Sequence, residues 1–423
     1  MRRDRRALIG AASALVLAAG GLTSAAADVR LSPPASVGFS PTGLSAINGA
    51  MHGLVDQKKL AGVTTLVARH GKVVHFDVYG RRDAESGAPI AKDTIFRIAS
   101  MTKPITGVAM MQLYEQGKWA MDDPVAKHIP EFANLKVKGP NGTLVEQTSP
   151  MTMRQLMSHT AGFDVSAGYE GANISPRDQN LKYMIGKLAT LPLADQPGAD
   201  WNYGPSVNIQ GYVVEKLSGE RLDRYFERHI FAPLGLMDTG FSVAPGKAGR
   251  VARVHTYGPD GTIVAAPQGP EPTVQPVFLA GSGGLYSTTE DYWRFAQGLL
   301  DIEKGRASGA RRILKPETVK LMRQNVLNDG VLVDLYGPSQ QGTGFGMDFA
   351  VVLDPLKANS PQGRESYYWG GAFGTWFWID PTNDLVFVGM IQNLNGSTPG
   401  RGTPEVRSLS QRLTYQALTD PAR

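Results

Sequence analysis

The sequence predicts an α/β protein of the α+β type, with an antiparallel sheet domain built from both ends of the chain and an inserted, mainly helical domain. Residues 62–80 form two β-rich runs around His70 and Gly71, which is typical of a hairpin. Residues 366–379 and 385–392 form a second pair of runs around residues 380–384. Helical patterns lie between the two hairpins. Because hairpins imply an antiparallel sheet, both ends of the chain are expected to share one sheet.

Residues 1–27 are predicted to be a signal peptide rather than part of the fold. Four arginines between residues 2 and 6 precede an apolar run over residues 7–22, and three alanines at 25–27 provide an A-x-A cleavage site. The Arg5–Arg6 pair also resembles a twin-arginine signal. The apolar run is short for a bilayer, and no cysteine is present to carry a lipid. We therefore expect a periplasmic or secreted protein without a stable membrane span.

The composition narrows the functional classes further. The chain has 423 residues, 42% of them hydrophobic, which is enough for a large core and two structural lobes. Its formal charge of +5 falls to about +2 without the signal peptide, so nucleic-acid binding is not expected. The absence of cysteine excludes disulfides and thiol nucleophiles. No two of the seven histidines have H-E-x-x-H spacing, and we expect neither a metal nor a cofactor.

The sheet domain is assigned to residues 28–95 and 281–423, and the helical domain to residues 96–280. The cleft between them is the expected place for a small-molecule site. Helical spacing predicts helices after Ser100 and at several later segments. The alternation in Trp376-Phe377-Trp378-Ile379 is mostly aromatic on both faces, as in a covered central strand. The later helical segments are residues 153–158, 181–189, 207–217 and 222–230, together with helices from 290 and from 316 to 324 that would pack on the sheet.

Ser100 and Lys103 are the strongest chemical signal. If a helix starts near Ser100, the two side chains share one face, and a neutral amine there can accept the proton of the serine hydroxyl. Pro104 fits the first turn of such a helix, whose free N–H groups favour a developing negative charge. A serine three residues before a lysine is frequent by chance, but no other lysine in this chain has one.

Tyr203 is the candidate general base. It lies in a loop that enters a helix, and a phenol beside a lysine ammonium can exchange protons with a serine hydroxyl. A tyrosine packed under a loop is the alternative interpretation.

Residues 369–372, Trp-Gly-Gly-Ala, are predicted on the first strand of the second hairpin. The two glycines allow another backbone or a ligand to approach closely, and a glycine kink in a packed strand is the alternative. The N–H groups of Ser100 and Ala372 together would form a two-donor oxyanion hole.

Two other segments are interpreted as structural. The glycine-rich stretch 281–288 lacks the lysine of a P-loop and is expected to be a tight wall of the cleft. His159 is expected to hydrogen-bond a loop near the cleft. No G-x-S-x-G elbow exists, which argues against an α/β-hydrolase triad.

These motifs, in this order, resemble the serine β-lactamase-like superfamily, on the branch shared by class C β-lactamases, D-alanyl-D-alanine peptidases and family VIII carboxylesterases. The resemblance covers about residues 40–395. It implies a β-lactamase/transpeptidase-like fold with Ser100 as nucleophile, Lys103 as its partner, Tyr203 as general base and the backbone of Ala372 as an oxyanion donor.

The chain departs from penicillin-recognising members at two motifs. Where they carry Y-x-N and K-T-G, it has Tyr203-Gly204-Pro205 and Trp369-Gly370-Gly371. A pocket without the lysine favours an apolar substrate group on Trp369, Gly370 and Gly371 over a carboxylate. We therefore expect an exported serine carboxylesterase. The alternatives are a β-lactamase or a D-alanyl-D-alanine carboxypeptidase or D-aminopeptidase, with another cation such as Arg364 in place of the lysine, and a penicillin-binding sensor without turnover. In each case the partner is a small ester or amide.

Overall fold

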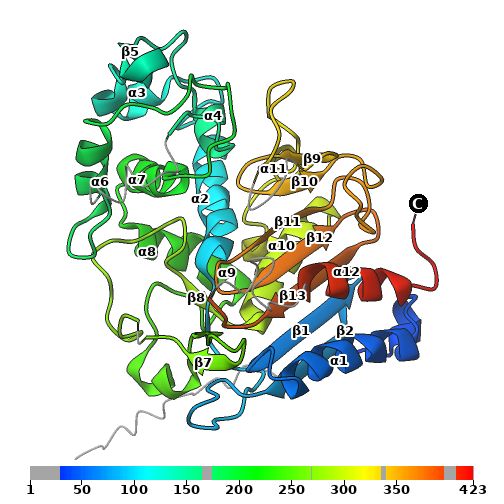
Figure 1. Ribbon diagram of the computed structural model, residues 1–423. Coiled ribbons are helices and arrows are strands. Elements are labelled where there is room, and N and C mark those ends of the chain that lie inside the picture. The colour runs from blue at the N-terminus through cyan, green and yellow to red at the C-terminus, as the bar shows by residue number, and fades with distance from the viewer. Residues whose placement is uncertain (1–28, 164–173, 268, 335–339, 395–405, 423) are drawn as a thin grey trace, which may run out of the picture.

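The computed structural model describes residues 29–163, 174–267, 269–334, 340–394 and 406–422. The predicted signal peptide therefore lies outside the described residues. A large antiparallel sheet with helices on both faces occupies one side of the molecule, and a group of helices around α2 occupies the other (Figure 1).

The sheet has seven strands in the order β2-β1-β13-β12-β11-β10-β9, and every neighbouring pair is antiparallel. Strand β1 from the N-terminal part pairs with β13 from the C-terminal part, from Thr64 opposite Met390 to Arg69 opposite Leu385. Both ends of the chain therefore build one sheet, as the sequence predicts. The strands are β1 (Gly62–Arg69), β2 (Lys72–Gly80), β9 (Thr343–Phe345), β10 (Ala350–Val352), β11 (Tyr367–Gly370), β12 (Trp376–Asp380) and β13 (Leu385–Met390).

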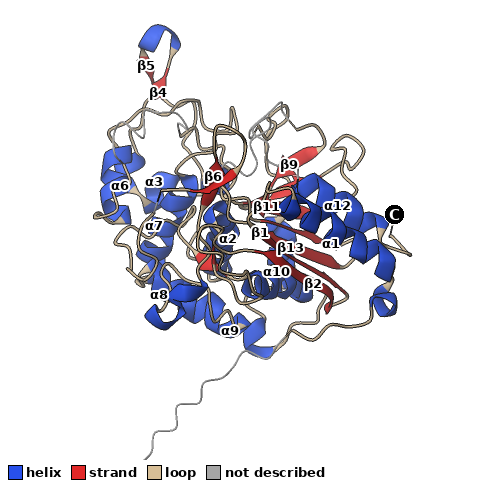
Figure 2. Cartoon of the chain, turned by 60° about the horizontal axis from the view of Figure 1, so that its bottom comes forward, coloured by secondary structure: helices blue, strands red, loops and turns tan. Residues whose placement is uncertain are grey.

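Helices cover both faces of this sheet (Figure 2). Helices α1 (Pro41–Asp56) and α12 (Val406–Gln416) pack against each other, and α1 also contacts β1 and β2. Helix α10 (Thr289–Glu303) contacts β1, β12 and β13, and α11 (Pro316–Met322) packs beside it. Strand β12 is buried at every position, and Trp378 stacks on Phe387 of β13 at 4.1 Å between ring centroids. This confirms the expected covered central strand.

The second hairpin differs from the prediction in one respect. The predicted long strand over residues 366–379 is two strands, because β11 ends at Gly370 and β12 begins only at Trp376. The residues between them turn through Gly374, which has a φ of 87° and donates its N–H to the Gly371 carbonyl at 3.0 Å. Ala372, predicted on a strand, lies in this turn.

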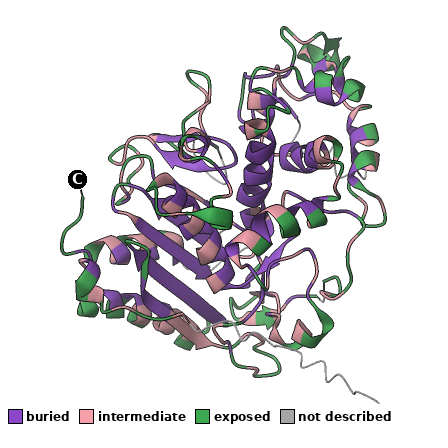
Figure 3. Ribbon diagram, turned by 180° about the vertical axis from the view of Figure 1, so that it is seen from behind, coloured by how far each residue is buried: buried purple, intermediate pink, exposed green. Residues whose placement is uncertain are grey.

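Helix α2 (Lys103–Glu115) is the centre of the helical part. Every residue from Lys103 to Leu113 is buried, as expected of a helix surrounded by other elements (Figure 3). Helix α7 packs along it, and α4, α6 and α8 pack on α7. These helices are α4 (Met153–Met157), α6 (Leu181–Leu188), α7 (Ser206–Ser218) and α8 (Leu222–Phe226), the last continuing through the π turn Glu227–Phe231 into α9 (Ala232–Leu234).

Shorter elements connect the two parts. Strands β3 (Phe96–Arg97) and β8 (Tyr286–Ser287) pair where the chain enters and leaves the helical part. The domain boundaries at residues 95 and 280 stay a prediction. No helix in the described ranges is long and apolar enough to cross a membrane. The remaining elements are α3 (Val125–His128), β4 (Val137–Lys138), β5 (Leu144–Val145), β6 (His255–Tyr257) and β7 (Ile263–Ala265), with short 3-10 turns between them.

Candidate active site

Ser100 lies in a 3-10 turn, Ala99–Thr102, that runs directly into α2. The residue before it, Ala99, has a φ of 44°, a left-handed conformation that a residue with a Cβ adopts only when its surroundings hold it there. Two backbone hydrogen bonds of the preceding residue, Ile98, hold Ala99 in this conformation. The Ile98 N–H donates to the Leu285 carbonyl at 3.0 Å, and the Ile98 carbonyl accepts the N–H of Met101 at 3.1 Å. The predicted helix start near Ser100 is thus a strained turn followed by a helix.

Lys103 is 4% exposed, and its ammonium nitrogen has two oxygen neighbours. Lys103 Nζ donates to Ser100 Oγ at 3.2 Å and to Ser282 O at 2.7 Å. The Ser282 N–H in turn donates to Asn208 Oδ1 on α7 at 2.9 Å, and Thr106 Oγ1 donates to Gly281 O at 2.7 Å. The glycine-rich stretch therefore forms a wall against α2 and α7 that orients Lys103 toward Ser100.

Tyr203 lies beside this pair, in the loop that leads into α7. Lys103 Nζ is 4.4 Å from the centroid of the Tyr203 ring, and the Tyr203 hydroxyl accepts a hydrogen bond from Trp369 Nε1 at 3.3 Å. The ring also stacks on Trp201 at 5.6 Å between centroids. The structure therefore brings together Ser100 and Lys103 from one segment, Tyr203 from the loop before α7 and Trp369 from β11.

The side chain of Trp369 faces Tyr203 and is 6% exposed. It also packs edge-to-face on Phe345, with ring centroids 5.5 Å apart. Little of the indole surface is left for the apolar substrate group that the sequence places there. Its indole N–H donates to the Tyr203 hydroxyl, and its ring also packs near Trp201.

His159 belongs to the same aromatic group, in contact with Trp201, Tyr203 and Phe345. Its backbone carbonyl accepts the N–H of Asn202 at 2.7 Å, which holds the loop before Tyr203. Neither ring nitrogen has a partner among the described residues. Burial, and to a lesser extent the nearby Lys103 charge, lower the pKa of His159 well below its usual value. The histidine orders the loop as expected, but through its backbone and its packing rather than through its ring nitrogens.

The two glycines of the third motif are explained by close approaches. A Cβ at Gly371 would lie 2.4 Å from the carbonyl oxygen of Ile98, and a Cβ at Gly370 would lie 2.5 Å from Arg407 Nη2. The turn that carries Ala372 is thereby packed against the residue two positions before Ser100. Among the described residues, neither the Ser100 N–H nor the Ala372 N–H donates to another protein group.

A buried carboxyl group that the sequence analysis did not single out lies behind α2. Asp348 is 0% exposed, and its Oδ1 accepts a hydrogen bond from Gln210 Nε2 at 3.2 Å. Burial raises the pKa of Asp348 well above its usual value, against the smaller opposing effects of the Gln210 hydrogen bond and the Lys103 charge. Its carboxyl fits against α2 because residue 107 is glycine, where a Cβ would lie 2.8 Å from Asp348 Oδ2.

Arg364, the predicted replacement for the missing lysine, lies away from this site. It is exposed in the loop before β11, and its carbonyl accepts a hydrogen bond from Thr382 in the turn between β12 and β13. That turn is at the opposite end of β12 from the turn that carries Ala372. No group of three or more potential metal ligands occurs in the described parts of the chain.

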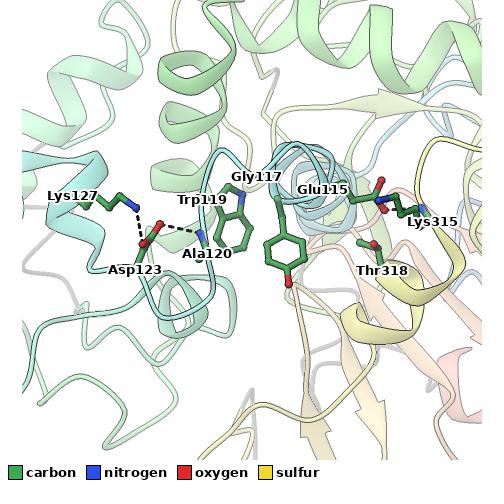
Figure 4. Close-up of a pocket in the computed structure, with 9 residues that line it drawn as sticks. Glu115, Gly117, Trp119, Ala120, Asp123, Lys127, Lys315 and Thr318 are labelled. Carbon is green, nitrogen blue, oxygen red and sulfur yellow. Dashed lines mark hydrogen bonds and ion pairs between the residues drawn. The ribbon is translucent and has the colours of Figure 1, made fainter.

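A separate pocket of about 430 Å³ lies at the other end of α2 (Figure 4). Three of its charged side chains have partners, because Lys127 pairs with Asp123 at 2.8 Å and Glu115 accepts the backbone N–H of Lys315 at 2.6 Å. Ser100 precedes the start of α2, and Glu115 ends it, so about 20 Å of helix separates the pocket from the nucleophile.

Comparison with known proteins agrees with this architecture. The family model described as Beta-lactamase matches residues 47–410. Protein Rv1367c of Mycobacterium tuberculosis is 33% identical over 388 residues, which cover 86% of this chain and 96% of that protein. Esterase EstB of Burkholderia gladioli is 31% identical, and the match covers 76% of this chain and 83% of that protein. The solved structure of EstCE1 is described as a hydrolase with promiscuous acyltransferase activity. It has a TM-score of 0.74 at 26% identity, and the match covers 90% of this chain and 99% of that chain.

The match spans the segments that carry Ser100, Lys103, Tyr203 and the β11 motif. The chain belongs to the beta-lactamase family and is a serine hydrolase of the esterase- and acyltransferase-like kind within it.

Proposed function

We propose that this serine hydrolase is exported and cleaves carboxylic esters through an acyl-enzyme on Ser100. The observation that carries the proposal is the contact between Lys103 Nζ and Ser100 Oγ at 3.2 Å, with the centroid of the Tyr203 ring 4.4 Å from the same nitrogen. This arrangement offers the serine two neighbouring groups that can take its proton.

The reaction has two steps on the same residue. Ser100 Oγ bonds to the ester carbonyl carbon and gives its proton to the Lys103–Tyr203 pair, while the N–H groups of Ser100 and Ala372 hold the oxyanion. The bond to the alcohol oxygen then breaks, and the alcohol leaves with that proton. Water next bonds to the carbonyl carbon and gives one of its protons to the Lys103–Tyr203 pair. The bond to Ser100 Oγ then breaks, and the acid leaves as that proton passes to the serine.

Neutral esters are favoured over penicillins because of the third motif. Trp369 stands where penicillin-recognising members of the family carry a lysine, and Arg364 lies at the turn beyond the far end of β12. A substrate carboxylate would lose its hydration there without gaining that lysine as a partner. The relative named Esterase EstB, at 31% identity, supports the same preference.

The test is steady-state hydrolysis of a p-nitrophenyl ester series and of nitrocefin by the mature protein, with Ser100→Ala in parallel. We expect ester turnover that the variant abolishes, and slow or no nitrocefin cleavage. Efficient nitrocefin turnover would assign the chain to β-lactam hydrolysis. A stoichiometric burst without turnover would assign it to the sensor class. An ester rate that is unchanged in Ser100→Ala would refute the proposed nucleophile.

Acyl transfer is a second candidate because it uses the same acyl-enzyme, and the relative EstCE1 is described as having promiscuous acyltransferase activity. If an alcohol replaces water in the second step, adding methanol to the assay raises the rate of p-nitrophenol release and produces the methyl ester. An unchanged rate and free acid as the sole product would restrict the enzyme to hydrolysis.

Export is proposed from the signal peptide over residues 1–27. Fractionation of cells that produce the full chain is expected to give a mature protein outside the cytoplasm. Replacement of Arg5 and Arg6 by lysine tests the twin-arginine route. If the replacement leaves export unchanged, the general secretory route is used instead.

A further inference from the structure

Arg407, in the first turn of α12, reaches the turn between β11 and β12. Its Nη2 donates to the carbonyl of Gly371 at 3.2 Å and to the carbonyl of Thr375 at 3.4 Å. These residues flank the turn, and the Gly371 N–H donates to the Thr375 carbonyl at 2.7 Å. The guanidinium group therefore fixes the residues at both ends of the turn, Gly371 and Thr375, from the side of α12. The Arg407 side chain fits there because residue 370 is glycine, since a Cβ at this position would lie 2.5 Å from Arg407 Nη2.

The Gly371 carbonyl belongs to the same peptide group as the Ala372 N–H. A cation that hydrogen-bonds a carbonyl oxygen draws electrons from the peptide and makes the N–H of that peptide a stronger donor. The positive charge of Arg407 thus acts on the Ala372 N–H through one planar group.

The other side of the turn is fixed to the nucleophile segment. Thr375 Oγ1 donates to the carbonyl of Ile98 at 3.2 Å, and Ile98 precedes Ser100 by two residues. The turn that carries the Ala372 N–H is therefore bonded through Thr375 to the segment that carries the Ser100 N–H, and Arg407 bonds the opposite side of this turn.

We propose that Arg407 is a positioning residue that fixes the Gly371–Ala372 peptide and strengthens the Ala372 N–H as an oxyanion donor. The proposal deepens the proposed function and rests on it. Arg407 does not touch the substrate in this role. Its effect is therefore expected when negative charge develops on the carbonyl oxygen, and not when neutral substrate binds.

The experiment compares the wild type with Arg407→Met, Arg407→Lys and the control Arg412→Met. Arg412 is an exposed arginine on the same helix, so its loss removes the same charge without touching the turn. For each protein, kcat and KM for p-nitrophenyl butyrate are measured together with the inhibition constant of phenylboronic acid. The boronate bonds to the serine as a tetrahedral anion and reports on the oxyanion site.

In Arg407→Met we expect kcat to fall and the boronate inhibition constant to rise, each by about tenfold, since direct loss of an oxyanion donor costs about 100-fold or more. KM should change less than about twofold, because neutral substrate does not use the interaction. Arg407→Lys should recover most of the loss, and Arg412→Met should behave as the wild type.

Wild-type kcat and boronate affinity in Arg407→Met would overturn the proposal. So would an equal loss in Arg407→Lys and Arg407→Met together with a lowered melting temperature, since that is the result of a purely structural contact. If the wild type hydrolyses no ester but captures boronate at Ser100, the proposed ester hydrolysis fails, and the boronate comparison alone decides the role of Arg407. If it does neither, both proposals fail.

Discussion

At the scale of single residues, Tyr203 is held from both sides. The Lys103 ammonium lies over its ring, and the Trp369 indole N–H points at its oxygen. The indole donor stabilises the phenol oxygen when it has given up its proton, and the aromatic neighbours keep the ring in place. The tryptophan of the third motif therefore supports the proposed general base.

Tyr203→Phe is expected to lower kcat for p-nitrophenyl esters by about 100- to 10,000-fold, because it removes the group that exchanges the serine proton. KM and the melting temperature should change little, since the ring and its packing remain. Tyr212→Phe, at a partly exposed position on α7, is the control and should keep wild-type rates. A Tyr203→Phe enzyme with a near-normal kcat would leave Lys103 as the sole base.

At the scale of elements, the crossing of α1 and the end of α12 depends on Gly43. A Cβ at Gly43 would lie 2.7 Å from the backbone Cα of Ala417, whereas a Cβ at Gly49 on the same helix would meet nothing within 4 Å. The two glycines thus allow a matched comparison.

Gly43→Ala should lower the free energy of unfolding by about 1–3 kcal/mol, because the backbones must separate. Gly49→Ala should raise it by about 0.5–1 kcal/mol through helix propensity. Urea denaturation of both variants measures the two effects. Equal changes in the two variants would show that the helices do not pack this closely in solution.

Strand β2 carries a buried histidine that makes stability depend on pH. His75 Nε2 and Thr65 Oγ1 on β1 are 2.8 Å apart, and burial lowers the pKa of His75 to about 4. The folded state therefore keeps His75 neutral, while the unfolded chain takes up a proton below about pH 6.5. The stability contributed by this histidine is complete above that pH and is lost as the pH falls toward 4.

Between pH 7.5 and 4.5 the wild type should lose about 2–3 kcal/mol more than His75→Gln, which cannot take up the proton. Urea unfolding of both proteins at the two pH values measures the difference. Parallel losses would assign the acid sensitivity to other groups.

The elements that the sequence predicts best are those with local signals. The hairpin around His70 and Gly71 and the pairing of Ser100 with Lys103 need only neighbouring residues, and both are found close to where the pattern places them. The sequence does not reveal the turn at Ala372, because the aromatic residues of β11 and β12 continue the same pattern on both sides of it. The three-residue strands β9 and β10 are too short for a periodic signal.

The residues that orient the catalytic groups have no local signal in the sequence. Asn208 acts on Ser282, Asp348 lies against Gly107, and Arg407 reaches Gly371. In each case the partner is far away in the sequence, and only the folded chain brings the two together. The nucleophile could thus be predicted from the sequence, whereas the groups that orient its surroundings could not.

At the scale of the whole molecule, one continuous hydrophobic core joins the two parts. It includes Met110 and Val213 of the helical part and Phe377 and Val388 of the sheet. Because residues of both parts share this cluster, unfolding of one part exposes core residues of the other.

We therefore expect denaturation in a single transition, with coincident curves from tryptophan fluorescence and far-ultraviolet circular dichroism. Trp119, which packs on Tyr114 of α2, and Trp378 of β12 report on the two parts separately, and Trp119→Phe and Trp378→Phe variants assign the signal. Two resolved transitions would show that the parts unfold independently.

The pairing of β1 with β13 has a consequence for how the protein is made. The hairpin of β1 and β2 leaves the ribosome early, but the strand that β1 pairs with is synthesised roughly 300 residues later, which takes about 15–60 s at ordinary rates of translation. During that interval the open edge of β1 is exposed to pairing with other chains. The sheet is completed only once nearly the whole polypeptide has been released, so the nascent chain depends on cellular factors that shield this edge until its last strands arrive.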